Sequence, residues 1–176
     1  HDALPIWDAL LRILGDIQLP FPVFSNFEGE VEIHRGDSNL IAEQVDEVDA
    51  AYLDPPYNQH PYGSNYFMLN TITRYERPQS ISRVSGIPDN WNRSEYNRRG
   101  QALEVFTELI DKLKAKYLLI SFNSEGFIPL PKMLEVLKTQ GDVEVLETQY
   151  NTFRGSRNLR QRDIHVTEYL YLVERA

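Results

Sequence analysis

The chain has 176 residues, of which 41% are hydrophobic and 11% are aromatic, as in a globular protein of one domain. It contains no cysteine, which excludes disulfides and thiolate metal sites. Eighteen basic residues against 26 acidic ones give a net charge of −8, which disfavours a nucleic-acid partner unless the positive charge is clustered. No apolar run approaches the roughly 20 residues of a membrane helix, so we expect a soluble protein without a membrane partner.

Residues 1–30 are predicted to form an N-terminal helix and a linker. The segment Pro5–Ile17 has apolar residues at the spacing of one helical face, and the stretch LPFPVF then breaks the helix with two prolines. The remaining residues, 31–176, are predicted to form the C-terminal part of a larger domain.

Strands and helices alternate along this second part. Strands are predicted over Val31–Ile33, Ala50–Leu53, Tyr117–Phe122, Val143–Thr148 and His165–Val173, and helical segments over Asn39–Gln44, Tyr66–Tyr75, Gln101–Lys116 and Pro131–Gln140. The apolar run YLLISF predicts a strand covered on both faces, and Gly141 is expected at the C-cap of the last helix. The polar segment Arg77–Arg99 is predicted to be a functional or mobile loop. This order predicts a three-layer α/β domain with a mostly parallel sheet and a C-terminal antiparallel hairpin.

The stretch AYLDPPYN places an acid, two prolines and an aromatic residue at the end of a predicted strand. Open parallel sheets have their sites at this edge, so Asp54 occupies a site position. The prolines fix the backbone and remove two N–H donors. The segment therefore presents one carboxylate, fixed carbonyl acceptors and one aromatic face.

These groups suit a planar substrate that carries an amino group. The carboxylate and a backbone carbonyl can accept both amino hydrogens while the tyrosine ring stacks on the heterocycle. The lone pair of such an amino nitrogen is delocalised into the ring. Two hydrogen-bond acceptors that favour a tetrahedral nitrogen would localise this lone pair on the nitrogen, where it can attack. The acceptors would thereby stabilise the transition state specifically. The chemistry indicated is alkyl transfer to nitrogen.

The tetrapeptide Asp54-Pro55-Pro56-Tyr57 resembles the catalytic motif of adenine-specific DNA methyltransferases that use S-adenosylmethionine. Residues 52–76, 117–127 and 150–170 are similar to type II modification methylases, particularly the FokI-like branch of the Dam-type group, so the resemblance covers roughly residues 31–176. It implies a Rossmann-like methyltransferase fold, S-adenosylmethionine as methyl donor, no metal, and double-stranded DNA as substrate. It also implies a monomer in the bacterial cytoplasm, with a cognate restriction endonuclease as a system partner that it does not bind directly.

The resemblance assigns roles to individual residues. The predicted catalytic residues are Asp54, Pro55, Pro56 and Tyr57; the predicted cofactor contacts are Asp37, Ser38, Asp54, Asn58 and Tyr66. Tyr62, Asn65, Ser121 and Asn123 are expected to line the same pocket. The predicted DNA contacts are Phe153, Arg154, Arg157, Asn158 and Arg160, within the run RGSRNLRQR, which holds four arginines and no acid. A base in a duplex cannot reach such a pocket, so it must be extruded from the helix.

The glycine-rich turn that binds the methionine end of the cofactor in this family has no counterpart here. No two of the nine glycines are two residues apart, and the first residue is His1 rather than methionine. We therefore expect a C-terminal part of a longer enzyme, incomplete at its N-terminus, inactive by itself and weak in cofactor binding.

Three alternative interpretations remain. Cytosine-N4 methyltransferases usually carry Ser in place of Asp54, and enzymes that methylate RNA bases or glutamine often carry Asn there, so the acid favours adenine. A catalytically inactive DNA-binding fragment is the alternative from a different class. At single positions, DPPY could be a structural turn, Asp37 could cap a helical turn at Ser38, and RGSRNLRQR could be a solvated loop.

Overall fold

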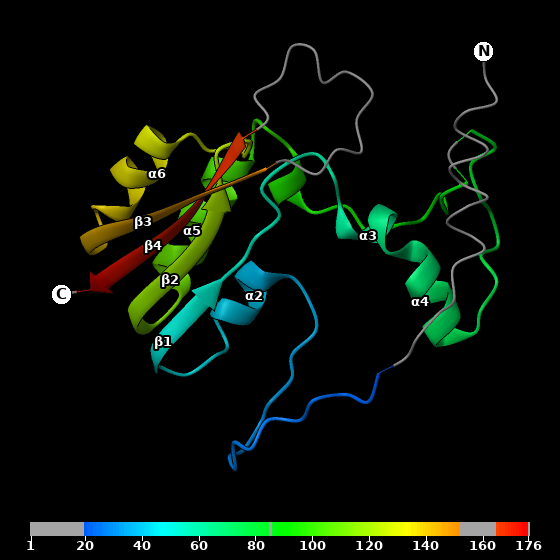
Figure 1. Ribbon diagram of the computed structural model, residues 1–176, viewed down its shortest axis with the longest axis horizontal. Coiled ribbons are helices and arrows are strands. Elements are labelled where there is room, and N and C mark those ends of the chain that lie inside the picture. Colours follow the sequence, from blue (N-terminus) through cyan, green and yellow to red (C-terminus); the bar gives the residue numbers. More distant parts are fainter. Residues whose placement is uncertain (1–19, 85, 152–164, 176) are drawn as a thin grey trace. The chain divides into compact units, whose positions relative to one another are not determined.

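A computed structural model describes residues 20–84, 86–151 and 165–175 (Figure 1). The chain divides into two units between Ile33 and His34. The predicted helix Pro5–Ile17 lies outside the described residues. None of the described helices is long and apolar enough to cross a lipid bilayer.

Residues 20–33 of the first unit form neither helix nor strand. The predicted strand Val31–Ile33 is therefore wrong: the side chains of Val31 and Ile33 are 78% and 88% exposed. So short a strand needs a neighbour that satisfies its backbone N–H and C=O groups, and no described strand pairs with it.

The second unit contains a four-stranded sheet in the order β1-β2-β4-β3. Its strands are β1 (Val48–Leu53), β2 (Ala115–Asn123), β3 (Gly141–Asn151) and β4 (His165–Arg175). β1 and β2 are parallel, and β4 lies antiparallel between β2 and β3. The predicted C-terminal hairpin is confirmed, and β4 is the one described strand that runs against the others. The α/β class is confirmed as well.

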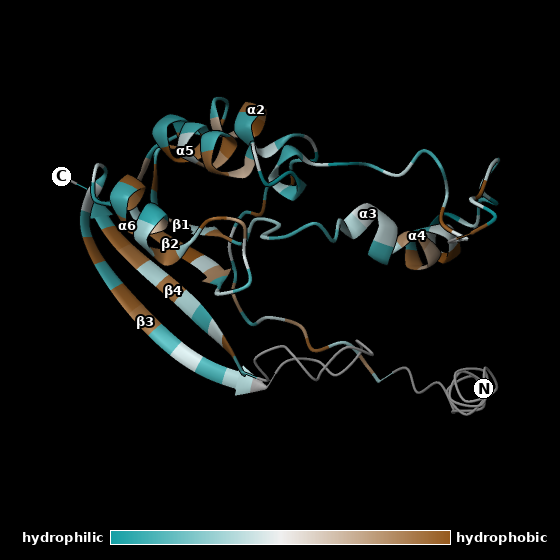
Figure 2. Ribbon diagram, turned by 90° about the horizontal axis from the view of Figure 1, so that it is seen from above, coloured by the Kyte–Doolittle hydropathy of each residue, from teal (hydrophilic) through white to brown (hydrophobic). Residues whose placement is uncertain are grey.

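One face of the sheet carries the hydrophobic core. On β2 the side chains of Leu118, Ile120 and Phe122 are buried, and they share one cluster with residues of α5 (Ala102–Lys112) and α6 (Leu130–Leu137). Figure 2 shows these two helices beside the strands. Successive side chains of a strand point to opposite faces, so Leu119 and Ser121 lie on the other face, where they are only partly buried. Among the described residues, the prediction that both faces of this strand are covered is wrong.

Two element ends differ from the prediction. α5 ends at Lys112 rather than Lys116 because β2 begins at Ala115. α6 has its C-cap at Lys138, so the assignment of Gly141 as a C-cap is wrong. Gly141 instead starts β3, where a Cβ atom would collide with the carbonyl oxygen of Glu174.

The remaining helices are short. They are α2 (Ser38–Ala42), α3 (Tyr62–Asn65), α4 (Phe67–Arg74) and the 3-10 helix η1 (Glu95–Asn97). The helix predicted over Tyr66–Tyr75 is confirmed as α4, whose C-cap residue, Tyr75, has the left-handed conformation (φ 54°). The loop predicted over 77–99 contains one isolated β-bridge, between Ile81 and Pro88, besides η1.

Candidate functional site

The Asp54–Tyr57 segment begins directly after β1, at the strand end predicted from the sequence. The Asp54 side chain is exposed, whereas Pro55 is buried and Pro56 is half-buried. The carbonyl oxygen of Tyr57 accepts a hydrogen bond from the Phe127 N–H at 2.7 Å. We call Asp54–Tyr57 the acidic segment. Phe127 follows β2, so this bond fixes the acidic segment to the loop after β2, the parallel neighbour of β1.

The Tyr57 ring is held from the side of the core. Its centroid lies 6.0 Å from that of Phe122, with an interplanar angle of 68°, an edge-to-face contact. Burial raises the pKa of the Tyr57 hydroxyl, and the charge of Glu168 raises it further, while the Asn123 side chain acts in the opposite direction. The hydroxyl is therefore protonated at neutral pH.

Polar side chains of three strands gather beside Tyr57. Glu168 on β4 pairs in register with Asn123, the last residue of β2. The Tyr150 hydroxyl of β3 donates a hydrogen bond of 2.8 Å to the Glu168 carboxylate. Burial and this bond raise the pKa of Tyr150 to about 12. Sequence reasoning assigned no role to Tyr150, although its position near the end of one strand and that of Glu168 near the start of the next could have indicated it.

Asn58 continues the site beyond Tyr57. Its carbonyl oxygen accepts a 2.7 Å hydrogen bond from the side-chain amide of Asn97, the last residue of η1. Its own side-chain oxygen accepts a bond from the His60 N–H at 2.9 Å. Asn97 thus orients the segment after the prolines, and no spacing in the sequence pointed to it.

Tyr62 and Tyr66 lie parallel to each other at the start of the helical pair α3 and α4. Their ring centroids are 5.4 Å apart with an interplanar angle of 14°. Burial raises the pKa of Tyr62 and the charge of Asp54 raises it further, so this stack lies within electrostatic reach of the acid. Of the residues expected to bind cofactor, Asn58 and Tyr66 therefore belong to the elements that directly follow the acidic segment.

Asp37 and Ser38 occupy the start of α2. The Asp37 carboxylate accepts hydrogen bonds from the backbone N–H groups of Asn39 at 2.9 Å and Leu40 at 3.4 Å, which makes it the N-cap of this helix. The alternative of a capping role for Asp37 is thereby confirmed, and its role in cofactor binding stays a prediction.

The predicted DNA contacts lie outside the described residues: Phe153, Arg154, Arg157, Asn158 and Arg160. β3 ends and β4 begins on either side of this stretch, with Asn151 paired to His165. The described residues include no group of three or more His, Asp or Glu side chains placed to hold a metal ion.

Residues 23–127 match the family model of D12 class N6 adenine-specific DNA methyltransferases. The type II methyltransferase M.NlaIII of Neisseria lactamica is 28% identical over 82% of this chain and 43% of that protein. The modification methylase StsI of Streptococcus sanguinis (28% identical) and the type II methyltransferase M.FokI of Planomicrobium okeanokoites (27% identical) each match 96% of this chain and 26% of their own length. The chain thus spans between about a quarter and two fifths of these relatives. No solved structure matches it.

Proposed function

Because the chain belongs to the D12 class N6 adenine-specific DNA methyltransferase family, we propose that it carries the base-binding part of a site-specific DNA adenine-N6 methyltransferase. The observation that carries this proposal is the Asp54–Tyr57 segment at the end of β1, with its carbonyl and its ring held by Phe127 and Phe122. The type II and modification methylases among its relatives support a role as the modification enzyme of a restriction-modification system.

In the proposed reaction an adenine is extruded from the duplex and stacks on the ring of Tyr57. The Asp54 carboxylate and the Pro55 carbonyl accept hydrogen bonds from its 6-amino group. Two acceptors favour a tetrahedral nitrogen, so the lone pair leaves the ring and becomes available for attack. S-adenosylmethionine would supply an electrophilic methyl group and leave as the neutral thioether S-adenosylhomocysteine, while the amino nitrogen gains the methyl group and releases one proton to solvent.

The residues of this chain suit only part of the methyl donor. Asp37, Ser38, Asn58 and Tyr66 offer carboxylate, hydroxyl, amide and aromatic groups of the kind that bind a nucleoside. Backbone N–H groups of a glycine-rich turn would be needed to bind the methionine carboxylate. That turn has two glycines two residues apart, and no two of the nine glycines in this chain have that spacing. We therefore propose these four residues as contacts of the adenosine portion alone.

The proposal includes a Rossmann-like methyltransferase sheet, supported by the order β1-β2-β4-β3 and the single reversed strand β4. Double-stranded DNA is the proposed partner, bound in part by the arginines of residues 154–162. We also propose a monomer in the bacterial cytoplasm that acts without direct contact to its cognate endonuclease.

Methyl transfer by the full-length protein tests the function. With DNA and S-adenosylmethionine labelled in the methyl group, we expect the label in N6-methyladenine. Asp54→Ala removes one of the two acceptors and should lower the rate by at least about a hundredfold. The control Asp49→Ala removes an exposed aspartate of β1, the strand that precedes Asp54, and should change the rate less than twofold.

Two results would contradict the proposal. Label in N4-methylcytosine would assign the site to the other amino-methylating class. Absence of label, with DNA binding retained, would make the chain a binding module. Thermal melting of Asp54→Ala distinguishes a loss of chemistry from a loss of fold, and its exposed side chain predicts an unchanged melting temperature.

A further inference from the structure

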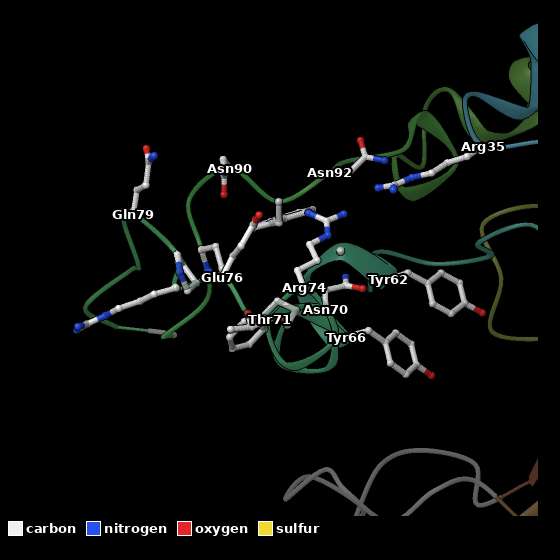
Figure 3. A pocket seen from close by; sticks show the side chains of 16 residues that line it. Arg35, Tyr62, Tyr66, Asn70, Thr71, Arg74, Glu76, Gln79, Asn90 and Asn92 are labelled. Carbon is white, nitrogen blue, oxygen red and sulfur yellow. Dashed lines mark hydrogen bonds between the residues drawn. The ribbon is translucent and has the colours of Figure 1, made fainter.

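A groove of about 1160 Å³ lies beside α3 and α4, bordered on its other side by residues of the stretches 76–79 and 88–92 (Figure 3). We call it the α4 groove. Its volume exceeds the roughly 300–1,000 Å³ of pockets that enclose a small molecule. An open groove of this size suits a polymer segment better than a single ligand.

Three arginines line the α4 groove, namely Arg35, Arg74 and Arg77, with Glu76 as the one acidic lining residue. The lining therefore has a formal charge of 3 − 1 = +2, on a chain whose net charge is −8. All four side chains are exposed, and Figure 3 shows Arg35 and Arg74 directed toward the part of the groove near Asn92. Clustered guanidinium groups on an acidic protein are suited to bind phosphate oxygens.

Aromatic rings lie along the same groove. The stacked pair Tyr62 and Tyr66 is at one end, and Phe67 and Trp91 contribute further rings. The Trp91 ring also carries the guanidinium of Arg93, 4.3 Å from its centroid. Arginines that follow a backbone, combined with rings that stack on bases, are the features by which proteins bind nucleic-acid strands.

The wall of the groove formed by residues 88–92 contacts α3 through the backbone of Asn92. A Cβ atom at Gly63 would lie 2.7 Å from the carbonyl oxygen of Asn92, so only glycine permits this close approach. Beyond this wall, the side-chain amide of Asn97 in η1 donates its hydrogen bond to the carbonyl oxygen of Asn58, the residue after Tyr57. The charge of Asp54 also raises the pKa of Tyr62, which lines the groove, so this end of the groove lies near the acidic segment.

We propose that the α4 groove binds the sugar-phosphate backbone of the substrate DNA strand next to the extruded base. This inference rests on the proposed function, because it is the extruded adenine at Asp54 that places a strand beside Tyr62. Arg74 and Arg77 contact phosphates, and Trp91 contacts a base or a sugar. None of the residues that line the groove belongs to the arginine-rich stretch 154–162.

The test compares two double variants of the full-length protein that remove the same charge. Arg74→Gln with Arg77→Gln alters the groove, and Arg83→Gln with Arg98→Gln alters two exposed arginines outside it. Binding of a fluorescein-labelled DNA duplex is measured by anisotropy between 50 and 200 mM salt. Each phosphate contact contributes about 0.9 to the slope of log K against log salt, so the groove variant should lose a slope of about 1.8. Between 50 and 200 mM salt, the factor by which the DNA affinity of the groove variant falls should therefore be about ten times smaller than the factor for the wild type.

Four results decide the matter. A slope change restricted to the groove variant supports the inference, and equal slopes in both double variants overturn it. Weaker binding of S-adenosylmethionine with unchanged DNA binding would overturn it as well, because the groove would then hold the donor. If the wild type transfers no methyl group but the groove variant still shows the slope change, the proposed function fails and the DNA surface stands.

Discussion

Tyr57 has three groups with different surroundings in the site, namely its carbonyl oxygen, its ring and its hydroxyl. Its carbonyl oxygen accepts a hydrogen bond from the Phe127 N–H, its ring makes an edge-to-face contact with Phe122, and the pKa of its hydroxyl is raised. In the proposed reaction a ring face touches the substrate, so the hydroxyl has no chemical role there.

Substitution of Tyr57 separates the ring from the hydroxyl. We expect Tyr57→Phe to retain methyl transfer within about threefold, whereas Tyr57→Ala should lower kcat/KM about ten- to a hundredfold because stacking is worth about 1–3 kcal/mol per base. Since the pKa of Tyr57 is raised, wild type and Tyr57→Phe should have the same pH–rate profile between about pH 6 and 9. Tyr75→Ala, at a side chain that is 97% exposed, is the control. A Tyr57→Phe variant as slow as Tyr57→Ala would contradict this account.

At the residue scale, the sequence predicted the groups that belong to one local motif. Asp54 could be placed at a strand end because an apolar run precedes it and prolines follow it. Tyr150 and Asn97 could not be placed in this way. Their partners Glu168 and Asn58 are 18 and 39 residues away, and only strand pairing and the path of the 77–99 loop bring them together.

Among the elements, α2 depends on its neighbours for stability. It has five residues, too few for an isolated helix. Its buried Asn39 donates a hydrogen bond of 2.9 Å to the Val105 carbonyl of α5 and accepts one of 2.9 Å from the Tyr96 hydroxyl of η1. One amide thus joins three elements behind the site.

Removal of the Tyr96 hydroxyl should loosen this junction. Tyr96→Phe leaves the buried Asn39 oxygen without this donor, so we expect the free energy of unfolding to fall by about 1–3 kcal/mol at pH 8. Burial raises the pKa of Tyr96 from 10.0 to about 12. The folded state therefore holds this proton more tightly, and its stabilising contribution is complete below pH 10 and is lost as the pH rises through about 12.

Urea denaturation at pH 8 and at about pH 11 measures both effects. The wild type should lose more stability between these two pH values than Tyr96→Phe does, because the variant lacks this titration. Tyr75→Phe, at an exposed position, serves as the matched control. An equal loss in wild type and Tyr96→Phe would show that Tyr96 is not the group responsible.

Element types followed from the sequence more reliably than element ends. Apolar runs and helical spacing located β1, β2, α4 and α5 because burial produces those patterns. The early end of α5 and the position of Gly141 did not follow, since each is decided by a partner strand: β2 starts at Ala115, and Gly141 lies against Glu174. The strand predicted over Val31–Ile33 has a suitable composition but no described neighbour to pair with.

Over the whole second unit, the two faces of the sheet differ in their exposure. The face opposite the core carries large apolar side chains, namely Tyr52, Leu119, Leu146, Leu170 and Leu172. Tyr52 is 63% exposed and Leu146 is 53% exposed. In register, Tyr52 lies next to Leu119 and Leu119 next to Leu172, while Leu146 lies next to Leu170. Monomeric soluble proteins rarely expose large contiguous apolar patches, so this face differs from an ordinary water-facing surface.

Substitutions on the two faces should therefore differ in their effect on the 176-residue chain. Leu146→Gln should reduce the binding of an apolar fluorescent dye and change the free energy of unfolding by less than about 0.5 kcal/mol. Leu118→Ala, which empties a fully buried position on the opposite face, should cost about 2–5 kcal/mol. Dye fluorescence and urea denaturation measure the two effects. A large stability loss in Leu146→Gln would show that this face is covered in solution.

The hydrogen bond between the Phe127 N–H and the Tyr57 carbonyl makes one amide proton a reporter of the site. A bonded amide exchanges its hydrogen with solvent only when the bond opens. Slow exchange at Phe127 in the DNA-free protein would mean that the two loops are joined before the substrate arrives. The entropy of ordering them is then lost during folding, and the encounter with DNA proceeds without that cost.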